Sequence, residues 1–125
     1  MKKLVIEPSK STPFINFDAD QNNLLIQGES YPENTAEFYQ PVFNWLNQYV
    51  NEIEDQEVMV NVELIYFNSS TSKVLMDFFD ILDLSAQKNK ISVNWIYDAE
   101  DEDNLEYGED FQEDLKNLTF KFSTK

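Results

Sequence analysis

The chain has 125 residues, of which 42% are hydrophobic, and it contains ten Phe, six Tyr and two Trp. This length and composition suit one globular domain over residues 1–125 with a single packed core. Asp and Glu outnumber Lys and Arg by 24 to 9, which gives a net charge of −15. A surface of this sign repels phosphate backbones and anionic lipid headgroups, so neither nucleic acid nor a membrane is an expected partner.

Two residue types that carry much enzyme chemistry are missing, because the chain has no Cys and no His. Disulfides, zinc thiolate sites, thiol nucleophiles and Ser-His-Asp triads are therefore excluded. The basic start of the chain is followed by no long apolar region, so it does not look like a secretory signal. No segment approaches the roughly 20 apolar residues of a membrane span. We expect a cytoplasmic protein.

The first third of the chain predicts short strands. Residues 4–6 and 14–17 are β-like apolar runs, separated by a stretch with two Pro and several hydroxyl residues. Residues 18–23 are dense in turn formers, and another apolar run follows at 24–26. Two strands around such a polar turn form a β-hairpin.

A helix is predicted next, because apolar residues recur at three- and four-residue steps and share one face: Phe38, Val42, Trp45, Tyr49 and Ile53. Asn34 is a suitable N-cap, with Glu37 three residues later as its capping-box partner. Pro41 lacks the N–H group that a helix interior needs. We therefore expect the regular part of this helix to begin nearer Pro41.

The rest of the chain alternates strands and helices. The predicted elements are a strand at 58–67, a helix from 74 towards 86, a strand at 91–97, a helix at 103–116 and a strand at 119–122. The order that we assign to the whole chain is β-β-α-β-α-β-α-β. Strands that alternate with helices imply parallel pairs, so the fold class is α/β, with a mixed β-sheet covered by helices.

The turn after the central strand is the most informative segment, because function in parallel α/β sheets gathers beyond the carboxyl ends of the strands. This hydroxyl-rich turn, residues 68–72, is Asn-Ser-Ser-Thr-Ser, and Lys73 follows it. One Ser or Thr would suffice to cap the helix. Four in succession also suit a phosphorylation site, since helix N–H groups and the helix dipole stabilise a phosphate with which Lys73 could pair. Spacing alone leaves both interpretations open.

Residues 28–34 also have two interpretations. Gly28 allows a positive φ after a strand, Pro32 sets an extended turn, and Asn34 caps the helix. Tyr31 and Glu33 could instead lie on a partner-binding rim, because an aromatic beside an acidic residue suits an interface. We favour the structural interpretation, and the sequence leaves open whether this loop approaches the hydroxyl-rich turn.

The acidic run at residues 98–103 could suggest a calcium site, but it lacks the Gly that an EF-hand loop needs at its sixth position. An acidic flank that complements the dipole of the last helix is a simpler explanation. The chain also has no glycine-rich phosphate loop. We expect no metal site and no cofactor.

Four segments together resemble the SiaC family of bacterial regulatory phosphoproteins. They are Gly28-Glu29-Ser30-Tyr31-Pro32-Glu33-Asn34, Tyr66 to Lys73, Val93-Asn94-Trp95-Ile96-Tyr97 and Gly108-Glu109-Asp110-Phe111. These segments occur in the expected order and span nearly the whole chain. The first of them is the most specific.

The resemblance implies a single STAS-like domain, similar to anti-sigma factor antagonists, that is controlled by phosphorylation. A cognate Ser/Thr protein kinase would modify one hydroxyl, and a PP2C-like phosphatase would reverse the step. The unmodified form would bind a diguanylate cyclase in cyclic-di-GMP and biofilm signalling.

The family's target is the hydroxyl directly after the Asn of an N-[ST]-S-[ST] pattern, which is Ser69 here, with Ser70 as the second choice. Ser at this position departs from the Thr of the best-known pattern, and it keeps the acceptor oxygen. The candidate residues for binding the phosphate or the partner are Asn68, Ser70, Thr71, Lys73, Tyr31 and Glu33.

These inferences favour a non-catalytic signalling protein whose Ser phosphorylation controls a protein partner. Two alternatives remain. One is a scaffold that binds through the same face without being modified. The other is a hydrolase that uses carboxylates and a bound metal.

Overall fold

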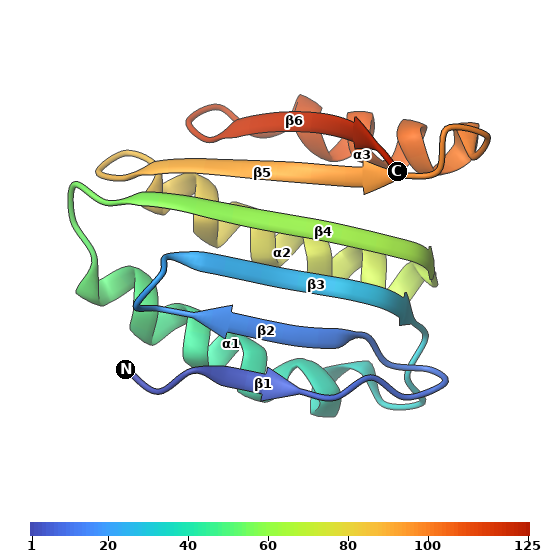
Figure 1. Ribbon diagram of the computed structural model, residues 1–125, viewed down its shortest axis with the longest axis horizontal. Helices are drawn as coiled ribbons and strands as arrows, with labels where there is room; N and C mark the ends of the chain where they lie inside the picture. The colour runs from blue at the N-terminus through green and yellow to red at the C-terminus, as the bar shows by residue number, and fades with distance from the viewer.

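The computed structural model describes residues 1–125 and contains one six-stranded sheet whose strands lie side by side in chain order (Figure 1). The strands are β1 (Leu4–Ile6), β2 (Phe14–Asp18), β3 (Asn23–Ser30), β4 (Glu57–Phe67), β5 (Lys90–Tyr97) and β6 (Thr119–Thr124). β1 pairs with β2, and β2 with β3, in antiparallel fashion. The three remaining pairs are parallel, so the sheet is mixed, as predicted.

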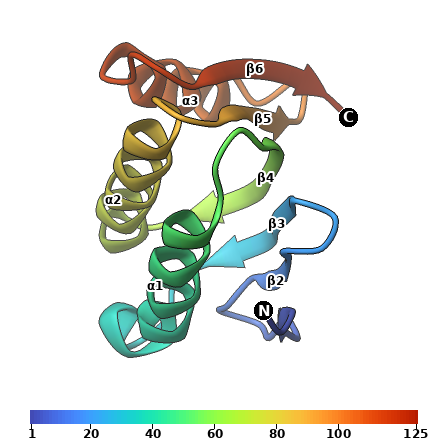
Figure 2. The same cartoon turned by 90° about the vertical axis from the view of Figure 1, so that its left-hand side faces the viewer.

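Three helices connect the parallel strands, namely α1 (Thr35–Glu52), α2 (Ser69–Ser85) and α3 (Glu102–Glu113). Crossover connections between parallel strands are right-handed, so helices that link neighbours in one direction across a sheet lie on one face. All three helices cover the same side of the sheet and leave the other side open (Figure 2). Each helix begins beside the carboxyl ends of the parallel strands and runs back towards their amino ends (Figure 1).

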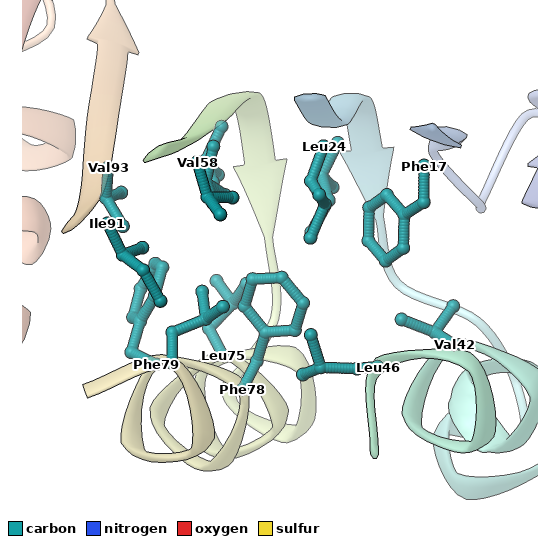
Figure 3. Close-up of a cluster of buried hydrophobic side chains, with 14 of the residues drawn as sticks. Phe17, Leu24, Val42, Leu46, Val58, Leu75, Phe78, Phe79, Ile91 and Val93 are labelled. Atoms are coloured by element: carbon teal, nitrogen blue, oxygen red, sulfur yellow. The ribbon is translucent and has the colours of Figure 1, made fainter. Parts of the chain in front are cut away.

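The hydrophobic core fills the space between the sheet and the helices. Every second residue of β4 from Val58 to Leu64 is buried, which confirms the strand pattern expected there. Phe17 and Leu24 point from the sheet towards Leu46 of α1 and Phe78 of α2 (Figure 3). This one core joins all the elements that surround the candidate site.

The predicted order of elements is wrong by one strand, because three strands precede the first helix. The expected hairpin is present as β2 and β3, which pair through Phe17 and Leu24. The additional strand is β1, where Leu4 pairs with Phe17 at the edge of the sheet. The sequence marks residues 4–6 as a β-like run, but three residues carry too short an alternation to count as a strand in the assigned order.

The expected late start of the first helix is also wrong, because α1 begins at Thr35 and includes Pro41. The Asn34 side chain accepts a hydrogen bond of 3.0 Å from the Glu37 N–H, which confirms the predicted N-cap. Pro41 is exposed, so water can satisfy the helix carbonyl that the proline ring leaves without a donor. A well-capped first turn therefore tolerates the proline that follows it.

The last helix is shorter than the predicted 103–116, because α3 ends at Glu113. One carboxylate oxygen of Asp83, in α2, accepts hydrogen bonds from the N–H groups of residues 116, 117 and 118 at 2.8–3.1 Å. These bonds hold the stretch before β6 as a turn, which prevents the helix from continuing.

Candidate functional site

The two segments singled out in the sequence meet at the carboxyl edge of the sheet. Ser30, the last residue of β3, pairs with Phe67, the last residue of β4. The N–H of Asn68 donates to the Ser30 carbonyl at 3.1 Å, so the parallel pairing continues into the hydroxyl-rich turn. The loop after β3 therefore approaches this turn, which the sequence had left open.

Asn68, and none of the four hydroxyl residues, caps α2. Its side-chain oxygen accepts a 2.9 Å hydrogen bond from the N–H of Thr71, and its backbone carbonyl accepts one from Ser72. Of the two interpretations of this turn, the one in which a Ser or Thr caps the helix is therefore wrong. Asn reaches the N–H three residues ahead as well as Ser does, and this leaves the hydroxyls that follow without a capping role.

Thr71 lies in the core and takes part in a buried hydroxyl network. Its hydroxyl is 2.8 Å from the hydroxyl of Ser30 and donates to the Ser30 carbonyl at 3.1 Å. The Ser30 hydroxyl is in turn 2.6 Å from the phenol oxygen of Tyr39. All three side chains are at least 98% buried, and burial raises the pKa of Tyr39 to about 12. This network fastens the starts of α1 and α2 to the end of β3.

Ser69 and Ser70 are exposed at the start of α2, and neither hydroxyl makes a hydrogen bond within the protein. Ser69 is the first residue of the helix, so its own N–H has no intrahelical partner. Lys73, one helical turn further on, is exposed and forms no ion pair. The predicted target thus lies on the surface, next to a cation without a partner.

α2 is also the only one of the three helices without an acidic residue in its first turn. The first turn of α1 contains Glu37, and that of α3 contains Glu102 and Asp103, whereas the first turn of α2 contains none. An acidic side chain in the first turn offsets the positive end of the helix dipole. At Ser69 no carboxylate of the first turn offsets that positive end, although the chain as a whole is strongly acidic.

Tyr31 packs on the strand that leads into the hydroxyl-rich turn, whereas the Glu33 side chain forms no hydrogen bond and no ion pair. The Tyr31 ring packs edge-on against Tyr66 of β4, with the ring centroids 5.7 Å apart. The Tyr31 N–H donates to the carbonyl of Ser11, which fixes the loop against the strand connection before β2. Glu33 is exposed and has no ion pair.

Asn104, near the start of α3, is a structural residue that the sequence did not reveal. Its side chain donates to the carbonyl of Leu64 at 2.8 Å and accepts from the Trp95 indole N–H at 2.9 Å. The Asn104 residue is 95% buried. Its N–H donates to the side chain of Asp101, which caps the helix. The start of α3 is therefore fastened to the ends of β4 and β5, at the same edge as Ser69.

The acidic run at 98–103 provides turn and cap contacts. Asp98 accepts from the N–H of Glu100, and Asp101 is the N-cap of α3. Glu102 and Asp103 lie in the first turn of α3, where carboxylates complement the helix dipole, as the simpler explanation of this run predicts. No group of three or more Asp and Glu side chains is arranged to hold a metal ion. No helix is both long and apolar enough to cross a membrane.

A family model for SiaC family regulatory phosphoproteins matches residues 6–125. The chain belongs to this family. An uncharacterized protein of Pseudomonas aeruginosa strain UCBPP-PA14 is 34% identical over 115 residues, which cover 91% of this chain and 90% of that protein.

Solved structures of SiaC from Pseudomonas aeruginosa are similar over essentially the whole chain. One has a TM-score of 0.90 at 31% identity, and the alignment covers 100% of both chains. A second similar chain comes from a crystal structure of the diguanylate cyclase SiaD in complex with its activator SiaC. That chain has a TM-score of 0.90 at 31% identity, with 98% of this chain and 99% of that chain covered. The SiaC family resemblance inferred from the four sequence segments is confirmed.

Proposed function

We propose that the protein is a non-catalytic signalling switch in which reversible phosphorylation of Ser69 controls binding to a diguanylate cyclase. The observation that carries this proposal is the contrast within the hydroxyl-rich turn. Ser69 is exposed and its hydroxyl has no partner, whereas Thr71 is fully buried and hydrogen-bonded. A kinase can reach the first hydroxyl and cannot reach the second. Ser70 is also exposed and is the second choice.

The surroundings of Ser69 favour a phosphate in electrostatic terms. A phosphate brings a charge of about −1.5 to −2 and three acceptor oxygens, which the free N–H groups at the start of α2 can satisfy. No acidic residue in the first helical turn opposes it, and Lys73 is free to pair with it. Phosphorylation is therefore compatible with the folded α2, and the switch acts on the surface without refolding the domain.

The proposed partner is a diguanylate cyclase, because a relative that matches 98% of the chain is named as the activator of one. The unmodified form binds and activates the cyclase through the surface around Ser69. A dianion placed in such a contact has to lose part of its hydration, and it repels any acidic group of the partner. Phosphorylation therefore releases the cyclase and lowers the production of cyclic-di-GMP.

The remaining parts of the system lie outside this chain. A cognate Ser/Thr protein kinase adds the phosphate and a PP2C-like phosphatase removes it, so this protein supplies neither a cofactor nor a catalytic residue. The switch acts in the cytoplasm, where ATP and the cyclase substrate are present, and its output affects biofilm formation. The domain is STAS-like in this proposal, similar to anti-sigma factor antagonists.

Phosphopeptide mass spectrometry on protein purified from its own cells tests the proposal. We expect a phosphate on Ser69 under at least one growth condition. Ser69→Ala should fold normally, carry no phosphate and keep the cyclase bound under every condition. Ser70→Ala is the matched control, because it removes another exposed hydroxyl one residue away, and it should behave as the wild type does.

Two results would contradict the proposal in different ways. If neither Ser69 nor Ser70 carries a phosphate in any condition while the cyclase is still bound, the protein is an unmodified scaffold. If Ser70→Ala abolishes the phosphate and Ser69→Ala does not, the switch is real and its site is Ser70.

A further inference from the structure

We propose that a groove between the end of β4 and the start of α3 is the docking site for an amphipathic segment of the cyclase that combines apolar and basic side chains. This inference rests on the proposed function, because it takes the cyclase as the partner. It adds the surface and the chemistry of the contact.

The apolar part of this groove is unusually exposed. Ile65, Tyr66 and Tyr107 are 59%, 52% and 49% exposed, and they are three of the seven large hydrophobic residues that the fold leaves exposed. Two hollows of about 230 and 260 Å³ adjoin here and share Ile65, Asp101 and Asn104 in their linings. The molecule therefore presents a hollowed apolar surface at the same sheet edge as Ser69.

Ile65 is exposed because it follows the buried Leu64 in the alternation of β4 and so lies on the opposite face of the sheet, and a local irregularity of the sheet occurs at this residue. The register of β3 against β4 shifts after Gly28, so that Leu64 pairs with Gly28 and Tyr66 pairs with Glu29. Ile65 is the extra residue of this bulge and has no partner on β3. Gly28 adopts φ of +126°, which a glycine allows without strain. Bulges often re-aim a side chain near functional sites, and here the alternation of β4 breaks at Tyr66, which is exposed although it follows the buried Leu64 by two residues.

The rim of the groove is acidic, so a segment that binds there is expected to carry positive charge. Glu63, Asp98, Asp101 and Asp103 line the two hollows. The one basic residue in the lining, Lys125, is already paired with Glu63 at 3.1 Å. Three carboxylates therefore remain without a cation. A segment that places Lys or Arg over this rim and apolar residues on Ile65 matches both properties.

The groove is also connected to Ser69 through aromatic contacts. Tyr66 packs on Tyr31, and Phe67, two residues before Ser69, packs on Tyr107 with the ring centroids 5.4 Å apart. A second groove, between the ends of α1 and α2 near Leu84, lies at the opposite ends of the helices. A phosphate on Ser69 can disturb an occupant of the first groove directly, whereas the second groove is about a helix length away.

Binding of the diguanylate cyclases of the source organism to matched variants tests this inference. For a cyclase that binds the wild type, Ile65→Ser should weaken binding by about tenfold or more, since it removes a central apolar anchor. Leu84→Ser is the matched control, because Leu84 is 67% exposed on the other groove, and it should bind as the wild type does. Thermal unfolding and phosphorylation at Ser69 confirm that both variants are folded.

The charge of the occupant is tested separately with Asp103→Lys. This variant should slow association several-fold at low salt, and the difference should shrink as the ionic strength rises. Asp80→Lys, a charge reversal at another exposed position, on α2, should have a much smaller effect.

The outcomes separate the two proposals. Wild-type binding by Ile65→Ser, or equal losses in Ile65→Ser and Leu84→Ser, overturns the docking site and leaves the switch intact. Loss of binding in Ile65→Ser, together with no effect of a phosphate on Ser69, supports the docking site and overturns the switch. If no cyclase binds the wild type, the partner is wrong and both proposals fail.

Discussion

The hydroxyls of Thr71 and Ser30 lie 2.8 Å apart in the core, although Thr71 is only two residues from the exposed Ser69. This contact joins the start of α2 to the end of β3, and Tyr39 extends it to α1 through Ser30. The same short segment thus contains a hydroxyl that anchors the turn and a hydroxyl that the solvent can reach. The anchor holds Ser69 in a fixed position at the start of its helix.

Replacing Thr71 by Val should destabilise the protein by about 1–3 kcal/mol. The substitution keeps the shape of the side chain but leaves the buried hydroxyl of Ser30 with one partner fewer. Urea unfolding measures the difference. Ser70→Ala, which removes an exposed hydroxyl without a partner, should change the free energy of unfolding by less than about 0.5 kcal/mol. Equal effects of the two substitutions would show that the network contributes nothing.

Gly108→Ala should destabilise the protein even though Ala favours helices more than Gly does. A Cβ at position 108 would lie 2.7 Å from the Trp95 ring and 2.9 Å from the Phe122 ring. These distances are shorter than van der Waals contact, so α3 or the two rings have to shift. We expect a loss of about 1–3 kcal/mol, against the gain of about 1 kcal/mol that helix propensity alone predicts. A raised melting temperature would contradict the close packing of α3 on β5.

The stability of the protein should fall as the pH rises from about 10 to about 12. Burial raises the pKa of both Tyr39 and Tyr49 to about 12, because the ionised phenol loses its hydration in the core. The folded state therefore keeps protons that the unfolded state releases near pH 10, and this contribution is fully present only below that pH. Urea unfolding across this range measures the fall, and Tyr49→Phe should make it less steep. An unchanged slope would contradict the ionisation of Tyr49 as a cause.

Asp83→Ala should destabilise the turn that ends α3 by about 1 kcal/mol at neutral pH, because three N–H groups lose their acceptor and water replaces it only in part. Burial acts to raise the pKa of Asp83, but the hydrogen bonds from residues 116–118 outweigh it and lower the pKa below its ordinary value. The stabilisation is thus present above about pH 4 and is lost as the pH falls through the lower pKa of the folded state.

Chemical unfolding of the wild type and Asp83→Ala at several pH values measures this difference. It should shrink as the solution is acidified. Asp80→Ala is the control, since Asp80 is exposed on the same helix and accepts no such bonds. A difference between Asp83→Ala and the wild type that does not depend on pH would contradict a role for the charged carboxylate.

The sequence predicted most elements because their periodicity is strong. The alternation from Val58 to Leu64 and the cap at Asn34 are local signals, and both are confirmed. Local signals failed to predict the structure where contacts between distant parts of the chain determine it. The end of α3 depends on Asp83, more than thirty residues earlier in the chain. Residues 4–6 form a strand because they pair with β2, and not because of a pattern in the three residues themselves.

The candidate site shows the same limit. The hydroxyl-rich turn could be found from its composition and its place after a strand, but the sequence does not distinguish a buried hydroxyl from an exposed one. The burial of Thr71 follows from the parallel pairing that brings Ser30 beside it. Asn104 carries no local signal either, because its two partners, Leu64 and Trp95, come from other elements.

The affinity of the cyclase for two forms of the protein, unmodified and with phosphoserine incorporated at position 69, tests the central claim most directly. Calorimetric titration with the diguanylate cyclase of the source organism provides the measurement, and phosphoserine at position 70 provides the matched control. We expect the unmodified protein to bind and the phosphate at 69 to weaken binding by about a hundredfold, or nearly 3 kcal/mol. The phosphate at 70 should have a much smaller effect. Equal affinities of the unmodified and the Ser69-phosphorylated protein would contradict the switch.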